Sequence, residues 1–201
     1  MSARQPWAVA ETGIRIRSAT PADRAGLAEF LAAMDPDGLY ERHFAHGEAP
    51  NHALLGRLAG ADGHDRVVLL GVGAGGTVIG HAEYVAEAGA AEFALMVAPP
   101  WRDCGVGKAL LAVLLATAAD AGQRKMHGLI QATNTRALMV ARKHGFGIRP
   151  GEDRRTVIVS RPLAPQLVAG LPDPEAGATT DISEPFRHDP DRTALHRRPF
   201  P

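Results

Sequence analysis

The chain has 201 residues, of which 45% are hydrophobic and 22% are charged, the proportions of one globular domain. Its formal net charge is +0, so no overall positive field predicts binding to nucleic acid or to an anionic membrane. The single cysteine, Cys104, excludes an internal disulfide, and no apolar run approaches the roughly 20 residues of a membrane span. These features predict a soluble, cytoplasmic protein.

The two ends of the chain differ in composition from the middle. Residues 1–12 are expected to be a flexible leader. Residues 162–201 hold 8 of the 15 prolines and no apolar periodicity, so they are expected to be a disordered tail. A single domain is therefore expected over residues 13–161.

Strands and helices alternate along this domain, which indicates an α/β fold. β-rich or alternating segments predict strands at 14–19, 66–72, 77–87, 91–98, 126–132 and 154–160. Apolar periodicity with start and stop signals predicts helices at 20–34, 36–44, 51–60, 105–122 and 133–146. Thr20, Pro21 and Asp23 form a typical helix start, and Gly122 is a typical helix end.

The first glycine-rich stretch, GVGAGG, resembles a dinucleotide-binding motif. Gly71, Gly73 and Gly76 match the spacing G-x-G-x-x-G. That motif requires a helix to begin at once, whereas TVIGHAEYV comes next here and is β-rich. The stretch therefore predicts a hairpin turn between two antiparallel strands.

The second stretch, RDCGVGKAL, lies after a predicted strand and opens a predicted helix at about Gly105. Free backbone N–H groups at a helix N-terminus favour an anion, and Gly105 and Gly107 allow close approach. Arg102 and Lys108 add positive charge. An ATP-binding Walker A loop is excluded because Arg102 replaces a glycine and Ala109, not Ser or Thr, comes after the lysine. The stretch predicts a phosphate loop without a Mg²⁺ ligand.

The motif R-D-C-G-V-G, after a strand and before a long helix, resembles the Q/R-x-x-G-x-G/A signature of the GNAT acyltransferase superfamily. N-T-R-A-L-M-V-A-R-K-H-G-F (134–146) resembles a later helix of that family. D-P-D-G-L-Y-E-R-H-F (35–44) and A-E-F-A-L-M-V (91–97) are similar to the acetyltransferase domains of bacterial protein-lysine acetyltransferases. The resemblance implies a GNAT fold, with a mixed, mostly antiparallel central sheet flanked by helices, and acetyl-CoA as co-substrate.

The same resemblance assigns roles to individual residues. Glu92 is expected to be the general base, because an attacking lysine amine with a pKa of about 10.4 must first lose a proton. Glu83, the other strand carboxylate considered, is expected to be a surface residue of its strand. Main-chain groups of Leu95, Met96 and Val97 are expected to hold the thioester and pantetheine. The remaining contacts with the cofactor are expected from Arg102, Asp103, Cys104, Gly105, Val106, Gly107, Lys108 and Asn134.

Other residues receive a plainer interpretation. Many GNAT enzymes have a tyrosine acid where this chain has Ala141, so the thiolate is expected to leave without a side-chain acid. Cys104 is interpreted as a spectator, since direct transfer needs no nucleophile. The nine histidines show no metal-ligand spacing, and no metal is expected. Candidates for the acceptor side are His81, Tyr40, Arg42 and Phe44.

The sequence thus predicts an N-acetyltransferase that transfers acetyl from acetyl-CoA to a primary amine, with a protein lysine as the favoured acceptor. A small-molecule amine acetyltransferase and a non-catalytic acyl-CoA sensor remain as alternatives. The protein is expected to be a monomer or a homodimer.

Overall fold

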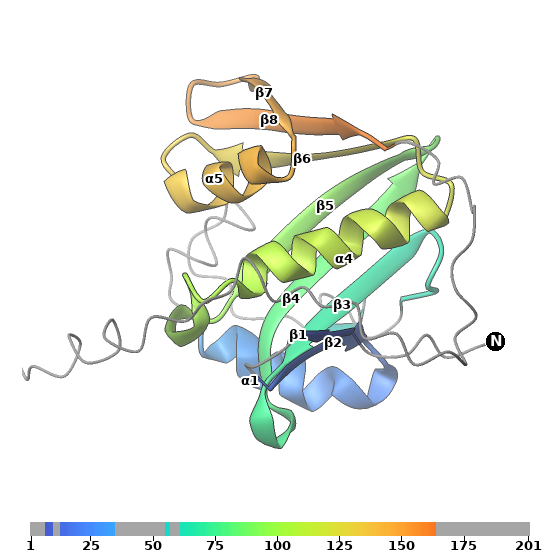
Figure 1. Cartoon of the computed structure of the whole chain (residues 1–201), viewed down its shortest axis with the longest axis vertical. Coiled ribbons are helices and arrows are strands. Elements are labelled where there is room, and N and C mark those ends of the chain that lie inside the picture. The colour runs from blue at the N-terminus through green and yellow to red at the C-terminus, as the bar shows by residue number, and fades with distance from the viewer. Residues whose placement is uncertain (1–6, 10–12, 35–54, 57–60, 164–201) are drawn as a thin grey trace, which may run out of the picture. The chain divides into compact units, whose positions relative to one another are not determined.

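A computed structural model describes residues 7–9, 13–34, 55–56 and 61–163. Its strands form one eight-stranded sheet in the order β1-β2-β3-β4-β5-β6-β8-β7 (Figure 1). The strands are β1 (Trp7–Val9), β2 (Ile14–Ser18), β3 (Arg66–Val72), β4 (Val78–Glu87), β5 (Ala90–Val97), β6 (Lys125–Gln131), β7 (Gly147–Pro150) and β8 (Thr156–Pro162). All neighbouring strands are antiparallel except β5 and β6, which are parallel. The predicted fold class is confirmed.

Helices cover both faces of this sheet. The helices with described bounds are α1 (Arg24–Ala32), α4 (Val106–Asp120) and α5 (Thr135–Lys143). Figure 1 shows α4 crossing in front of β3, β4 and β5. No helix in the described part of the chain is both long and apolar enough to span a membrane.

Two clusters of buried side chains result from the alternation of side chains along each strand. In the first, Leu110 and Leu114 of α4 pack with residues such as Tyr84 and Ala91. In the second, apolar residues of α1 pack with the opposite set of strand residues, including Met96. The sheet therefore separates an α4 face from an α1 face, and successive residues of β5 point to opposite faces.

The GVGAGG stretch connects two antiparallel strands, as the sequence predicts. Residues Ala74–Gly76 form a 3₁₀ turn between β3 and β4, and Gly73 N–H donates to the Thr77 carbonyl at 2.9 Å. Gly75 and Gly76 have φ of 76° and 86°, values that only glycine adopts without strain. The next element is β4 rather than a helix, so the stretch lacks the N-terminus that a dinucleotide site requires.

Several predicted boundaries differ from the structure. The helix expected over 20–34 begins as a 3₁₀ turn, Pro21–Asp23, before α1. The helix expected over 133–146 ends earlier, because Gly145 adopts a left-handed φ of 74° that terminates α5. The chain then forms β7, an edge strand that the sequence analysis did not predict.

The ends of the domain also differ from expectation. The segment expected to be a leader contains β1, which pairs with β2. Pro162, the first residue of the expected tail, ends β8, and Leu163 is buried. Residues 164–201 lie outside the described residues. So do the two short helices expected over 36–44 and 51–60, apart from Leu55 and Gly56.

Candidate active site

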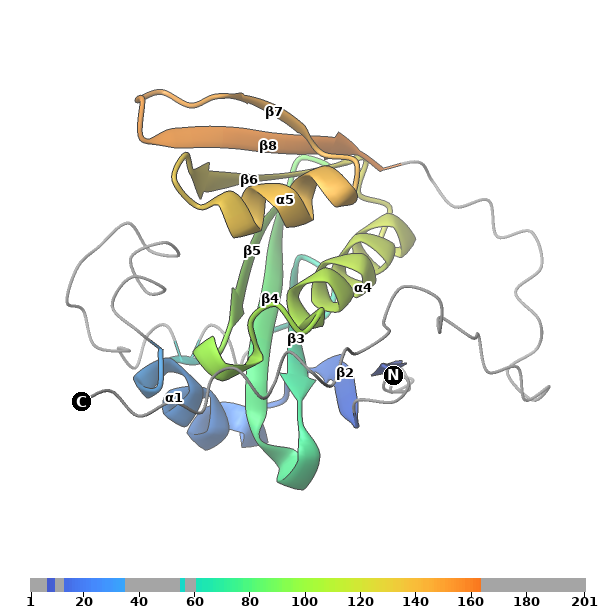
Figure 2. The same ribbon diagram turned by 60° about the vertical axis from the view of Figure 1, so that its left-hand side comes forward.

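The parallel strands β5 and β6 pair over a short distance and then separate. Only Ala90, Ala91 and Glu92 of β5 pair with β6, and the last pair is Glu92 with His127. β5 continues to Val97 and β6 to Gln131 without further pairing between them. We call the segments beyond the last pair, Phe93–Val97 and Gly128–Gln131, the divergence; Figure 2 shows β5 running away from β6 there.

Gly128 lies where the two strands begin to separate. A Cβ atom at this position would lie 3.0 Å from both the carbonyl oxygen and a ring carbon of Phe93. The Phe93 ring in turn packs against Phe146, with ring centroids 5.2 Å apart. A residue with a side chain at Gly128 would therefore push β5 and β6 apart at their junction. In the sequence, this junction is marked only by a glycine inside the predicted strand 126–132.

The main chain of β5 presents polar groups to the divergence. Ala98 N–H donates to the Ile79 carbonyl of β4 at 2.9 Å. Because successive residues of a strand point their N–H and C=O groups in opposite directions, Leu95 and Val97 direct theirs away from β4. Met96 directs its main chain toward β4, and its side chain is buried. Of the three predicted main-chain contacts, Leu95 and Val97 have the suitable orientation.

The predicted phosphate loop connects the end of β5 to α4. Gly105 is the N-cap of α4 and has a left-handed φ of 81°. The Ala109 N–H donates to the Gly105 carbonyl at 3.0 Å, so the N–H groups of Val106 and Gly107 precede the first intrahelical bond. A Cβ at Gly107 would lie 3.4 Å from the side chains of Leu95 and Val97, so this turn packs directly on β5.

The charged residues of the loop have partners within the chain. Arg102 Nε donates to the Val97 carbonyl at 3.2 Å, which ties the loop to the end of β5. Asp103 is exposed, has a φ of 62°, and forms an ion pair of 3.4 Å with Arg136 of α5. Cys104 is an exposed free thiol, and Lys108 is half-buried. The loop thus contains one carboxylate among its cations.

Asn134 is the N-cap of α5. Its side-chain oxygen accepts a hydrogen bond of 2.9 Å from the Ala137 N–H. This bond satisfies one of the free N–H groups at the start of the helix and stabilises it by about 1 kcal/mol. The side-chain oxygen is thus committed to the helix, and the amide NH₂ group of Asn134 is the part that could contact a ligand.

Glu92 lies at the junction of β5 and β6 on the α1 face, and its side chain is exposed. Val85 of β4 and His127 of β6 flank it in register. His127 is half-buried, and its Nδ1 atom is buried without a hydrogen-bond partner among the described residues. The proximity of His127 to Glu92 cannot be predicted from local sequence, because it depends on the pairing of two strands distant in sequence.

The expectation for Glu83 was wrong. Its side chain is buried rather than on the surface, and it forms an ion pair with Arg66 at 3.6 Å. The reason is that β4 is a central strand, and its α1 face is covered around Glu83. His81, two residues earlier on the same face, is also buried. Tyr40, Arg42 and Phe44 lie outside the described residues.

The arrangement combines three groups with distinct chemistry. The loop and the N-terminus of α4 can hold an anion, the main chain of β5 can donate hydrogen bonds along the divergence, and Glu92 can accept a proton at its narrow end. Within the described residues, no group of three His, Cys, Asp or Glu side chains lies close enough together to hold a metal ion.

A comparison with known protein families identifies the family of this chain. Residues 29–146 match the model of the acetyltransferase (GNAT) family. The chain belongs to the GNAT family. It is also 32% identical over 160 residues to the aminoglycoside N(6′)-acetyltransferase type 1 of Stenotrophomonas maltophilia, covering 75% of this chain and 94% of that protein. The protein is therefore an N-acetyltransferase of this family.

Solved structures agree with this assignment. The GNAT domain of S. lividans PAT has a TM-score of 0.70 and 25% identity, and the match covers 75% of this chain and 90% of that one. A phosphinothricin acetyltransferase from Sinorhizobium meliloti, solved in complex with acetyl-CoA, has a TM-score of 0.63 and 22% identity over 85% of this chain and 97% of its own. The second likeness concerns the fold alone.

Proposed function

We propose that this protein transfers acetyl from acetyl-CoA to the primary amine of a protein lysine, by direct transfer with Glu92 as general base. The observation that carries the proposal is the divergence of β5 from β6, with Glu92 at its narrow end and the phosphate loop at the far end of β5. Membership of the GNAT family supports acetyl transfer, and the likeness to the S. lividans GNAT domain supports a catalytic module of similar architecture.

Residues of this chain account for the binding of acetyl-CoA, the acetyl donor. N–H groups at the start of α4 and the loop residues Arg102–Lys108 hold the pyrophosphate, where the helix dipole favours negative charge. Main-chain groups of Leu95 and Val97 bind the pantetheine arm, and a β5 N–H donates to the thioester oxygen. Asn134 contributes its amide from the start of α5. Met96 contributes by packing rather than by its main chain.

Proton transfer is assigned to Glu92. Its carboxylate, directly or through one water, removes a proton from the acceptor ammonium, and the neutral nitrogen then attacks the thioester carbon. The carbon–sulfur bond breaks and the thiolate leaves. The nitrogen, which still carries one proton more than an amide, releases that proton through water to the thiolate. Ala141 occupies the position where other family members carry a tyrosine acid; it is buried in the core, so α5 supplies no acid there.

A small amine is the second candidate acceptor, favoured by the 32% identity to an aminoglycoside acetyltransferase. Release of CoA thiol should be measured with an aminoglycoside and polyamine panel, and with an acyl-CoA synthetase protein as lysine acceptor. Acetylated lysines mapped by mass spectrometry are expected on the protein. Fast turnover of a small amine without protein acetylation would contradict the lysine assignment.

The role of Glu92 has a separate test, which also addresses a non-catalytic acyl-CoA sensor. Glu92→Gln is expected to lower kcat/KM about 100-fold or more, because a positioned base contributes roughly 10²–10⁴-fold. Binding of acetyl-CoA, measured by calorimetry, should stay within about 2-fold because Glu92 lies outside the loop. Glu87→Gln, an exposed carboxylate on β4, is the matched control and should retain full activity. A Glu92→Gln rate close to wild type would remove Glu92 as the base.

A further inference from the structure

The formal net charge of +0 conceals a strong division of charge along the chain. Residues 121–163, which form β6, α5, β7 and β8, contain nine Arg or Lys and only two Asp or Glu. Strands β6, β7 and β8 contain no carboxylate at all. The two acids, Glu152 and Asp153, lie in the turn between β7 and β8.

The Asp153 side chain forms its hydrogen bonds within that turn. Its Oδ1 atom accepts hydrogen bonds from the Thr156 hydroxyl at 2.7 Å and from the N–H groups of Arg155 and Thr156. These bonds lower the pKa of Asp153, the Thr156 hydroxyl having the largest effect. The carboxylate stays charged, but it lies at the turn end of β8, whereas Lys125 pairs with Pro162 at the opposite end.

The register of the sheet shows which of these residues share the face of Glu92. Glu92 pairs with His127, so both side chains lie on the α1 face. Lys125 and Leu129 lie on the same face of β6, two residues before and after His127. Leu129 pairs with Ile158 of β8, and Ile158 pairs with Arg149 of β7. We call Lys125, Leu129 and Arg149 the cationic face.

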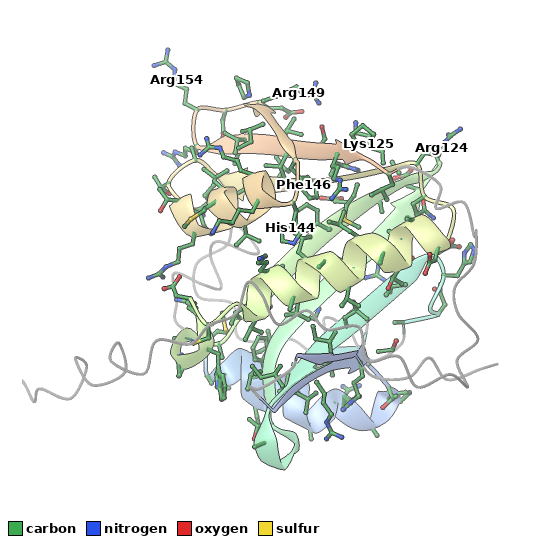
Figure 3. The ribbon with its side chains drawn as sticks, in the orientation of Figure 1. Arg124, Lys125, His144, Phe146, Arg149 and Arg154 are labelled. Atoms are coloured by element: carbon green, nitrogen blue, oxygen red, sulfur yellow. The ribbon has the colours of Figure 1, made fainter. Side chains whose placement is uncertain are left out.

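The cationic face is open to solvent. Lys125 and Arg149 are exposed, and Leu129 is 48% exposed, one of three large hydrophobic residues so exposed among the described residues. Figure 3 shows Arg149 and Arg154 on the β7–β8 hairpin, and Lys125 with Arg124 at the other end of these strands. An exposed leucine between two cations, on the same face as the proposed base, is suited to a partner that is both acidic and partly apolar.

We propose that the cationic face docks an acceptor protein whose target lysine is flanked by acidic residues and an apolar residue. This inference rests on the proposed lysine acetyltransfer and specifies its substrate class. The acceptor amine reaches Glu92, the flanking carboxylates meet Lys125 and Arg149, and the apolar side chain covers Leu129. A small amine cannot span these positions, so the face would act on protein acceptors alone.

Nucleic acid fits the same face less well. The only Phe, Tyr or Trp in 121–163 is Phe146, which is buried, so none of these rings is exposed there to stack on a base. The Leu129 side chain would also lie against phosphate groups, to which it cannot donate a hydrogen bond. A peptide supplies the amine, the carboxylates and the apolar group together.

The test uses three synthetic peptides around one central lysine: one flanked by Asp, Glu and Leu, one with Asn and Gln in place of the acids, and one with Arg. The full chain is expected to acetylate the acidic peptide with a kcat/KM about 10-fold above the neutral one at low salt, and this preference should shrink at high salt. Nα-acetyl-lysine methylamide serves as the small acceptor. Anisotropy of fluorescein-labelled acidic peptide gives binding without activity.

Charge reversal localises the effect. Lys125→Glu and Arg149→Glu should each reduce the preference about 5-fold and weaken peptide binding, while turnover of the small acceptor stays unchanged. Lys143→Glu on α5 is the matched control, since it makes the same charge change on an exposed residue of the helix that packs on the other face.

Three outcomes would overturn the inference. The first is equal acetylation of the three peptides by an enzyme that is active on the small acceptor. The second is acidic-peptide binding that is unaffected by either reversal. The third is a single-stranded oligonucleotide that binds through Lys125 and Arg149 while the acidic peptide does not. Inactivity on every amine with intact binding of the acidic peptide would instead contradict the proposed function.

Discussion

The chain up to the end of α4 and the chain from β6 onward are built differently. The described residues 13–34 and 61–120 carry nine Asp or Glu and six Arg or Lys. Residues 121–163 carry two Asp or Glu and nine Arg or Lys. The first region contains the whole of the second buried cluster and two thirds of the first, and residues 121–163 contribute the remaining third of the first cluster. The proposed base, Glu92, lies in the first region but at its border with the second.

Pairing within each region is extensive, and pairing between them is short. β4 and β5 share eight residue pairs and β6 and β8 share seven, but β5 and β6 share only three. A sheet that stayed paired would use every N–H and C=O of β5 internally. The comparison teaches that the site depends on incomplete pairing, because only the divergence leaves the main chain of β5 able to bind a ligand.

The largest effect on this junction is expected from Gly128→Ala. The added Cβ would lie 3.0 Å from the Phe93 carbonyl, a backbone atom that moves only if β5 moves. We expect the free energy of unfolding to fall by about 1–3 kcal/mol, as for other overpacked sites, with a lower kcat/KM in addition. Gly71→Ala in β3 is the matched control, since its nearest contact would be at 3.5 Å. Denaturant melts of both variants give the comparison, and equal stabilities would show that the junction tolerates a side chain.

A smaller, pH-dependent effect belongs to the first region. Arg17 and Asp23 form two hydrogen bonds of 2.6 and 2.7 Å that connect β2 to the start of α1. The Arg17 guanidinium, with smaller contributions from the Thr20 N–H and hydroxyl, lowers the pKa of Asp23 from 3.8 to about 2. A depressed carboxyl pKa stabilises the fold above the unfolded value and loses this contribution as the pH falls from about 4 to about 2.

Asp23→Asn should therefore destabilise the protein at pH 7 by about 1–2 kcal/mol, a range reduced for the partial exposure of Arg17. Thermal melts between pH 7 and pH 2 measure the difference from wild type, which should disappear at the acid end. Glu152→Gln, in an exposed turn of the second region, should show no such trend. A difference that is constant with pH would contradict the ion-pair explanation.

The smallest effect is expected from the ion pair that joins the two regions across the loop. Arg136 and Asp103 are 62% and 63% exposed, so solvent screens their attraction. Arg136→Ala should change the free energy of unfolding by less than about 0.5 kcal/mol, and this difference should stay below that value at both low and high salt. A loss above about 1 kcal/mol in denaturant melts would mean that this contact contributes more than a solvent-screened surface ion pair does.

Much of this architecture could be predicted from the local pattern of residues in the sequence. The proposed phosphate loop and the GVGAGG turn were distinguished by whether a helix or a strand comes after each glycine cluster, and helix α4 begins within one residue of the expected position. These features depend on neighbouring residues, so a single sequence contains them. The short β7 was missed because four residues give too little alternation to predict a strand.

Features that depend on strand neighbours could not be predicted in the same way. Glu83 and Glu92 occupy similar alternating segments, yet one is buried and the other is exposed. Their burial is decided by what covers each position of the sheet, which the sequence of β4 or β5 does not contain. The pairing of Glu92 with His127 likewise joins residues that the whole of α4 separates in sequence.

The loop before α4 contains two left-handed residues, Asp103 at φ 62° and Gly105 at φ 81°. For a residue with a side chain, such a conformation costs about 1 kcal/mol or more. That cost is incurred when the chain folds, so the conformation of the proposed phosphate loop exists before any ligand arrives and needs little reorganisation on binding. We therefore expect thermostability and affinity for acetyl-CoA to be coupled at this loop: a substitution that relaxes position 103 should raise the melting temperature and weaken binding at the proposed site.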